Sequence, residues 1–329
     1  MLDSFAWRRA ATGLVLVVLA PLAAQAQTYA NKTITMVVPY PAGGPSDFIT
    51  RQLQPELSKQ LGQQILVDNV GGVGGALGIQ KVLQAPADGH TMVMASPMEL
   101  ILAPIGLAAV KHKPEDLRLA GVLVKTTMIL LGRKDLPANT VDELIADAKK
   151  PGAKELSFGS VGAGSMYHLV AESFAKATGV KMLHVPYKGA APLLTDLMGG
   201  QIDVVFMPLA GNVGQLIKEG KVKAYGITAR QAHPQFAQLP LLTASKGLEA
   251  LEFDLWAGVQ VAKSTPEPIV AQINKAIAQS LQNADIRRAY ESTGNEVAKP
   301  MAPADLDKLY TAEIARYQAI AKSVNVQPQ

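Results

Sequence analysis

Apolar residues fall into two alternating patterns along the chain: short continuous runs, and segments with an apolar residue every three or four positions. The runs are rich in β-branched residues and predict strands, whereas the periodic segments predict amphipathic helices. Strands are predicted at residues 33–38, 64–67, 91–94, 128–131, 155–158, 181–185, 202–206, 222–228 and 256–261, and helices at 49–61, 141–145, 168–178, 193–198, 213–219, 269–281 and 304–323. This alternation is typical of α/β proteins with a largely parallel sheet.

Pro55 lies inside the first helical pattern, whose apolar face is formed by Ile49, Leu53, Leu57 and Leu61. Proline has no backbone N–H, and its ring clashes with the preceding turn of a helix. We therefore expect this helix to be kinked at Pro55 or divided into two pieces.

The N-terminus has the pattern of a signal peptide. Arg8 and Arg9 precede an apolar run at residues 13–22, and Ala24-Gln25-Ala26 supplies the small residues that signal peptidase requires. The run is shorter than the roughly 20 residues that cross a bilayer, and charged residues interrupt every later apolar run. We expect export to the periplasm, cleavage after about Ala26, and a mature protein without a membrane anchor.

Composition narrows the possible functions. The chain has 329 residues, which is enough for about two domains after the signal peptide is removed. It contains no cysteine, which excludes disulfides, thiolate zinc sites, a cysteine nucleophile and a lipoprotein anchor. The net charge is only +4, and the basic residues are scattered, so nucleic acid is not an expected partner. We expect a monomer.

Two glycine-rich segments share one arrangement: strand, glycine-rich turn, helix N-terminus. They lie at residues 37–47 and 156–165, one in each half of the mature chain. The first N–H groups of a helix lack intrahelical partners and carry the positive end of the helix dipole, which makes such turns suited to anions. Glycine lets a ligand approach the backbone closely. In open α/β sheets these turns lie at the carboxyl ends of strands, where ligands bind.

Motifs for enzymatic chemistry are not found. The chain has no nucleophile elbow, P-loop or dinucleotide-binding spacing, and its five histidines never stand at the helical spacing of metal ligands. His168 and His184 lie near the glycine-rich turns, and we expect each to hydrogen-bond backbone and fix a loop. Either Ser46 or the Asp47 carboxylate is expected to cap the first helix. No cofactor or metal is expected.

Several short motifs, in this order and spacing, resemble those of the Bug-type periplasmic binding proteins of tripartite tricarboxylate transporters. The resemblance covers nearly the whole mature length. The motifs are residues 38–47 (VPYPAGGPSD) with Arg51, 61–63 (LGQ), 67–69 (VDN), the glycines at 72, 74, 75 and 78, residues 87–91 (ADGHT), 159–165 (GSVGAGS) with His168, 184–189 (HVPYKG), 199–203 (GGQID) and 256–258 (WAG). The chain departs from the family at residues 70–76, where Ala76 stands in place of a polar amide.

The resemblance implies a two-lobe α/β fold, of the type II-like or flytrap kind, with a hinge and a central ligand cleft. Residues 27–128 and 229–329 would form lobe one and residues 129–228 lobe two, with crossings near 128 and 228. The implied partners are a small carboxylate and integral-membrane transporter subunits. The implied ligand-binding residues are Tyr40, Pro41, Ala42, Gly43, Gly44, Ser46, Asp47, Ser96, Ser160, Gly162, Ala163, Gly164, Ser165, His168, Tyr187, Phe206 and Met207.

Because few basic residues lie near the two loops, we expect backbone N–H and hydroxyl groups to hold the carboxylate, rather than an arginine clamp. Two other functions remain open at this point. One is a ligand-presenting component for a histidine kinase, and the other is an exported α/β hydrolase or isomerase. The enzyme would require a nucleophile–base pair that the motifs do not reveal.

Overall fold

The computed structural model describes residue 29 and residues 31–326, and the predicted signal peptide lies outside them. The strands are β1 (Ile34–Val38), β2 (Ile65–Asn69), β3 (Thr91–Ala95), β4 (Leu117–Arg133), β5 (Leu156–Ser160), β6 (Met182–Pro186), β7 (Val204–Pro208), β8 (Val222–Ile227), β9 (Asp254–Ala262) and β10 (Glu296–Val297). The α-helices are α1 (Pro45–Leu61), α2 (Ala76–Gln84), α3 (Ala103–Gly106), α4 (Val141–Ala148), α5 (Met166–Thr178), α6 (Ala190–Met198), α7 (Val213–Lys218), α8 (Glu267–Ser280), α9 (Ala284–Ser292) and α10 (Pro303–Ser323). Three 3₁₀ turns (Val73–Gly75, Pro114–Asp116 and Leu242–Ala244) and a π-helix (Met98–Leu102) complete the described elements.

The strands pair in the order β2-β1-β3-β9-β4-β7-β5-β6, and β8 and β10 both pair with β4. Pairing is parallel at the two ends, in β2-β1-β3 and in β7-β5-β6, and antiparallel wherever β4 or β9 takes part. The sheet is therefore parallel in two outer blocks rather than throughout. The centre differs because a single long strand, β4, pairs with strands of both blocks.

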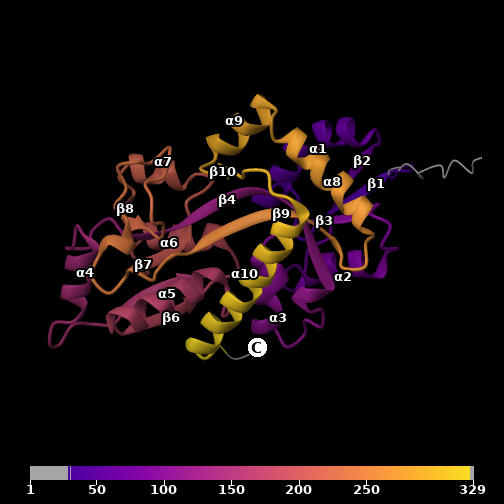
Figure 1. Cartoon of the computed structure of the whole chain (residues 1–329). Helices are drawn as coiled ribbons and strands as arrows, with labels where there is room; N and C mark the ends of the chain where they lie inside the picture. The colour runs from indigo at the N-terminus through magenta and orange to yellow at the C-terminus, as the bar shows by residue number, and fades with distance from the viewer. Residues whose placement is uncertain (1–28, 30, 327–329) are drawn as a thin grey trace, which may run out of the picture.

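Strand β4 connects the two ends of the molecule (Figure 1). Its first part pairs with β9, from Leu117 to Thr127, and its second part pairs with β7 and β8, from Met128 onward. The apolar pattern of the sequence predicts only residues 128–131 of this strand. In Figure 1, β4 and β9 run side by side across the middle, with α1, α2 and α8 at one end and α4 to α7 at the other. The molecule thus has two α/β ends joined by an antiparallel pair.

The two predicted crossing points lie next to each other. Thr228 is fully buried, and its N–H donates to the carbonyl of Met128 at 2.9 Å. The Thr228 hydroxyl lies 2.7 Å from the carbonyl of Phe253 and 3.1 Å from that of Met128. The chain therefore brings β4, the end of β8 and the start of β9 together at one point.

Residues 229–253, which the sequence assigns to lobe one, pack largely on elements of the other end. Leu241 forms a bridge with Ile227 of β8, and a Cβ on Gly214 of α7 would lie 2.4 Å from the ring of Phe236. These contacts attach the middle of the segment to β8 and α7, whereas His233 Nε2 lies 3.2 Å from the carbonyl of Gly294, between α9 and β10.

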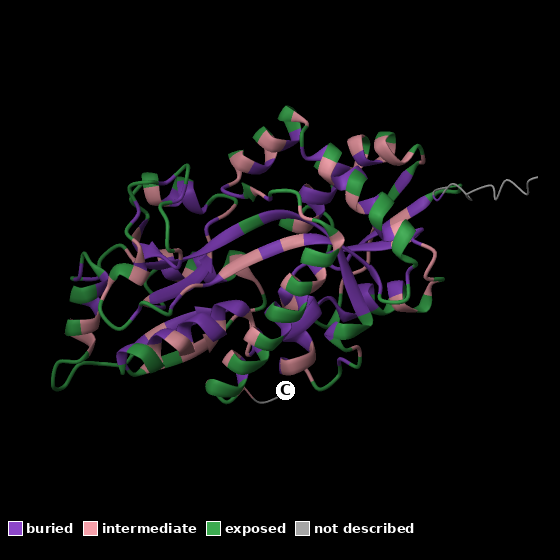
Figure 2. Ribbon diagram, viewed as in Figure 1, coloured by how far each residue is buried: buried purple, intermediate pink, exposed green. Residues whose placement is uncertain are grey.

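Alternating side chains of β1 and β3 face two different core regions. Met36 and Met92 belong to a core with Ile273 of α8 and Tyr290 of α9, whereas their neighbours Val37 and Val93 belong to a core that continues into the other end. A strand points successive side chains to opposite faces, so these strands are buried on both sides (Figure 2). Continuous apolar runs are the expected sequence pattern for such strands.

Helix α1 is one continuous helix, so the alternative in which Pro55 divides it into two pieces is wrong, and the kink at Pro55 stays a prediction. The Pro55 side is exposed, and solvent can hydrate the carbonyl that loses its N–H partner there. Helix α10 packs on β4 and on α5, and the amine of Lys176 donates to the carbonyl of Ser323 at 3.1 Å. Among the described residues, no helix is long and apolar enough to cross a membrane.

Candidate functional site

Loop one, residues 40–47, follows β1 and leads into α1. Gly43 has φ +83°, a conformation that favours glycine. The buried carboxylate of Asp47 accepts from the N–H of Gly43 at 2.9 Å, from Arg51 Nε at 2.9 Å and from Asn69 Nδ2 at 3.0 Å. The hydrogen bond from Arg51, chiefly, lowers the pKa of Asp47. The Asp47 carboxylate therefore fixes the shape of the loop.

The predicted side-chain cap of α1 is absent. Gly44 is the N-cap residue, and neither Ser46 nor Asp47 makes a capping hydrogen bond there. Within the described part of the chain, the N–H groups of Ala42, Gly44 and Ser46 have no acceptor. They lie at an exposed or half-buried helix N-terminus, where an anion is favoured by the dipole. Arg51 is already paired with Asp47.

Loop two, residues 160–165, follows β5 and leads into α5. Ser165 caps α5, because its hydroxyl accepts from the N–H of His168 at 3.4 Å and donates to the carbonyl of Gly162 at 2.6 Å. The N–H of Gly164 donates to His168 Nδ1 at 3.1 Å. This bond confirms the expectation that His168 fixes a loop through backbone. Ala163 lies at the tip between the two glycines, half-buried.

Two histidine rings stack beneath loop two. His168 and His184 have ring centroids 4.3 Å apart, and Phe158 stacks on His184 at 4.9 Å. Burial, together with the neighbouring imidazole, lowers the pKa of His168 to about 4, and burial also lowers the pKa of His184. Both rings are therefore neutral at neutral pH.

Ser160 and His184 make a close contact, 2.6 Å from Oγ to Nε2. His184 therefore bonds a serine hydroxyl, not backbone as expected. The pair does not have the properties of a nucleophile and base, because Ser160 is fully buried. Its Oγ also lies 3.0 Å from both the N–H and the carbonyl of Gly162. The contact holds the first turn of loop two.

A buried acidic cluster adjoins loop one. Glu99, in the π-helix, is fully buried, and its carboxylate accepts from the Ser96 N–H at 2.6 Å, the Ser96 hydroxyl at 2.9 Å and the Tyr40 hydroxyl at 2.9 Å. Burial raises the pKa of Glu99 to about 7, and burial and the Glu99 charge raise that of Tyr40. The hydroxyls of Ser96 and Tyr40 thus both donate their hydrogen bonds to Glu99. π-helical turns occur frequently at functional sites.

Loop two also touches the end of α3. A Cβ added to Gly106 would lie 3.3 Å from the Cα of Gly164 and 3.4 Å from the carbonyl of Ala163. The Tyr167 hydroxyl, near the start of α5, contributes to the raised pKa of Tyr40. Loop two therefore approaches α3, and Tyr167 at the start of α5 acts electrostatically on Tyr40 of loop one.

The remaining predicted residues differ in exposure. Pro41 is exposed in loop one. Tyr187 is half-buried beside loop two, and its hydroxyl donates to Asp196 at 2.8 Å. Phe206 is fully buried and packs against Phe174, with ring centroids 5.5 Å apart, and Met207 is also buried. The structure gives Phe206 no exposed surface for a ligand.

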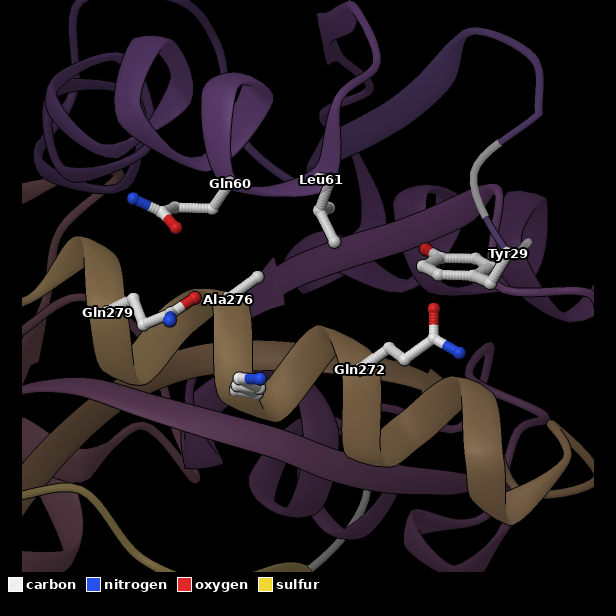
Figure 3. A pocket seen from close by; sticks show the side chains of 7 residues that line it. Tyr29, Gln60, Leu61, Gln272, Ala276 and Gln279 are labelled. Atoms are coloured by element: carbon white, nitrogen blue, oxygen red, sulfur yellow. The ribbon is translucent and has the colours of Figure 1, made fainter.

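A shallow groove lies elsewhere, between the end of α1 and helix α8 (Figure 3). Helix α1 has 17 residues and is about 25 Å long at 1.5 Å per residue, which separates this groove from loop one. Three of its seven lining residues are glutamines. The lining residues are Tyr29, Gln60, Leu61, Gln272, Lys275, Ala276 and Gln279.

Glu99, Tyr167 and Gly106 are not among the site residues predicted from the sequence. Glu99 is the single charged residue in the apolar segment 97–110, and a lone carboxyl in such a segment is a usable signal for a buried, specialised acid. Gly106 and Tyr167 carry no local signal, because their importance arises from contacts between distant segments.

Comparison with known proteins gives consistent matches. The model of the "Tripartite tricarboxylate transporter family receptor" matches residues 49–326. The periplasmic binding protein BugD is 30% identical, with a TM-score of 0.77, over 92% of this chain and 100% of its own. MatC from Rhodopseudomonas palustris with bound malate is 30% identical, with a TM-score of 0.75, over 88% of this chain and 99% of its own. The R. palustris protein Rpa4515 with adipate is 28% identical, with a TM-score of 0.79, over 91% of this chain and 99% of its own.

Proposed function

Because this chain belongs to the tripartite tricarboxylate transporter receptor family, whose members are periplasmic solute-binding proteins and not enzymes, we propose that it captures a small carboxylate for a transporter of that type. The Bug-type identification and the two-lobe fold expected from the sequence are thereby confirmed. The ligand class that we propose is an aliphatic or aromatic mono- or dicarboxylate. Malate and adipate, bound by two of the similar proteins, support this class.

The observation that carries the proposal is the geometry of loop one. The N–H groups of Ala42, Gly44, Ser46 and Asp47 lack acceptors within the described residues and lie at the N-terminus of α1. The Arg51 guanidinium is bound to Asp47. We therefore propose that backbone N–H groups hold the ligand carboxylate, and that loop two closes from the opposite side.

The proposal includes the remaining features of a transport receptor. These features are export with cleavage after about Ala26, a free monomer in the periplasm, and delivery to integral-membrane subunits, and membership of the family supports them. We place the lobe boundaries near residues 128 and 253, because residues 229–253 pack largely on β8 and α7.

The first test is a binding screen of the mature protein with malate, adipate, benzoate and terephthalate. A ligand at a hundred times its Kd adds about 2.7 kcal/mol to the free energy of unfolding, which raises Tm by several degrees. Calorimetry then gives Kd and stoichiometry. If folded, ligand-free protein shows no shift with any carboxylate, the proposed ligand class is wrong.

A matched pair of variants tests the role of the loop-one N–H groups. Gly44 has φ −82° and ψ 174°, values that proline can adopt, so Gly44→Pro removes one N–H without requiring a new φ. Gly44→Ala retains the N–H, and its Cβ meets only the carbonyl of Pro41, at 3.6 Å.

A hydrogen bond to a charged group contributes about 1.5–3 kcal/mol. We therefore expect Gly44→Pro to weaken carboxylate binding by roughly 10–100-fold, while Gly44→Ala binds like the unmodified protein. The Tm of both variants without ligand controls for folding. Equal affinities in two folded variants would show that this N–H does not contact the ligand.

A further inference from the structure

Glu99 is an acid in an environment that does not compensate its charge. Its side chain is fully buried, and its hydrogen-bond donors are the neutral groups of Ser96 and Tyr40. No ion pair to Glu99 exists among the described residues. A buried carboxylate without a cation is costly, and such a group commonly takes up a proton instead.

The groups that face Glu99 from the surrounding elements are also neutral near pH 7. The Tyr40 hydroxyl of loop one donates to the Glu99 carboxylate, and the charge of Glu99 raises the pKa of Tyr310 in α10. His112 lies 3.1 Å from the Glu99 carbonyl, and burial lowers the pKa of this histidine. Glu115 and Asp116, which act on Tyr310 and His112, add negative and not positive charge to these surroundings. Of the described groups named here, none therefore supplies a positive charge when an anion arrives.

Glu99 is coupled directly to loop one. The Tyr40 hydroxyl bonds the carboxylate itself, and Tyr40 begins the loop. On another side, a Cβ at Gly75 would lie 2.8 Å from the Cβ of Glu99, so the glycine-rich turn after β2 encloses the acid. A carboxylate bound at loop one and covered by loop two would place a second negative charge on the loop that Tyr40 connects to Glu99. Like charges close together disfavour the charged form of each acid.

We infer that Glu99 is a specificity-determining residue of the loop-one site, which takes up a proton when a carboxylate binds, so that the protein selects an anion together with H⁺. This inference rests on the proposed carboxylate function. The proton comes from solvent and adds to a Glu99 oxygen, which then donates a hydrogen bond within the cluster. No other bond is made or broken.

The pKa of Glu99 sets the pH range in which binding affinity should change. The pKa of Glu99 in the free protein is about 7, and a bound anion raises it further. Below pH 7 the acid is already protonated, so affinity is constant there. Above pH 7 affinity falls by up to tenfold per pH unit, because each binding event must then take up a proton. The imidazoles of loop two titrate below this window, since their pKa values are lowered.

The test is calorimetry of the mature protein with malate, or with adipate where malate gives no heat, at pH 6 and pH 8 in buffers of different ionisation enthalpy. We expect uptake of between about half a proton and one proton at pH 8 and almost none at pH 6, with Kd weaker at pH 8 by roughly tenfold. Glu99→Gln mimics the protonated acid. It should bind at pH 8 with the Kd that the unmodified protein has at pH 6, and without proton uptake.

A second variant keeps the inference testable if Glu99→Gln does not fold. Tyr40→Phe removes one hydrogen bond to the ionised acid, which should move the onset of the pH dependence to higher pH. Binding without proton uptake at pH 8, or an unchanged pH dependence in the folded variants, overturns this inference alone. Absence of heat with every carboxylate at both pH values overturns the proposed function and this inference with it.

Discussion

Gly106 provides a direct test of whether the two lobes close through the contact between α3 and loop two. The Cβ of Gly106→Ala would lie 3.3 Å from the Cα of Gly164 and 3.4 Å from the carbonyl of Ala163. These distances are a few tenths of an ångström too short for easy accommodation, and both neighbours are backbone. The substitution therefore opposes the arrangement in which loop two touches α3.

Gly106→Ala should weaken carboxylate binding and leave the stability of the free protein unchanged. Overpacking costs about 1–3 kcal/mol, and alanine is at the low end of this range. Gly106 is the last residue of a helix and is not at positive φ, so alanine itself is locally acceptable. With the lobes apart the added methyl is free, and Tm without ligand should not fall. At about 1 kcal/mol, carboxylate binding weakens about fivefold, and Gly106→Val should exceed tenfold.

Calorimetry of both variants measures this effect, and small-angle scattering with saturating carboxylate measures closure. Gly189→Ala is the matched control, because that glycine has an extended φ of 169° and its added Cβ meets no atom within 4 Å. If Gly106→Val binds as tightly as the control and closes equally, loop two does not approach α3 in the bound state, and the reasoning is refuted.

Three further predictions concern stability. Phe206→Leu should lower the free energy of unfolding in denaturant by about 1–2 kcal/mol and leave the Kd for the carboxylate unchanged. A tenfold loss of affinity would instead show that Phe206 lines the ligand site. The free energy of unfolding should fall by up to about 1.4 kcal/mol per pH unit as pH drops from 6.5 to 4, because His168 binds a proton in the unfolded chain but not in the folded protein. His168→Gln should reduce this pH dependence. An unchanged pH dependence in the variant would mean that other groups cause it. Arg118 is buried between Glu267 and Asp307, at 2.6 Å from each. Arg118→Met should therefore lower the free energy of unfolding in denaturant by about 1–3 kcal/mol. An unchanged free energy of unfolding would mean that water hydrates the two carboxylates adequately without Arg118.

Much of the candidate site could be predicted because its signals are local. The glycines at 43, 162 and 164 all have positive φ, and such residues occur where the chain turns sharply between strand and helix. Ser165 caps α5, as serine before a helical pattern often does. These features depend on interactions within four residues along the chain, so the sequence alone determined them.

The capping prediction for Ser46 and Asp47 was wrong for a non-local reason. Asn69, from the end of β2, donates to the Asp47 carboxylate, and this carboxylate also holds Gly43 and Arg51. The sequence shows that Asp47 stands at a helix start, but not which donors the fold brings to it.

Burial and pairing between distant segments were decided by the tertiary structure. Glu99 becomes an unusual acid only because β3, loop one and the turn after β2 enclose it, and Phe206 faces the core because Phe174 of α5 packs on that side of β7. Most strands and helices and the two glycine-rich loops could be predicted from the sequence, since short-range periodicity and turn geometry encode them. The first part of β4, and α2, α3, α9 and β10, could not. The environment of each charge, and the approach of Gly106 to Gly164, depend on desolvation and contacts that exist only once the whole chain has packed.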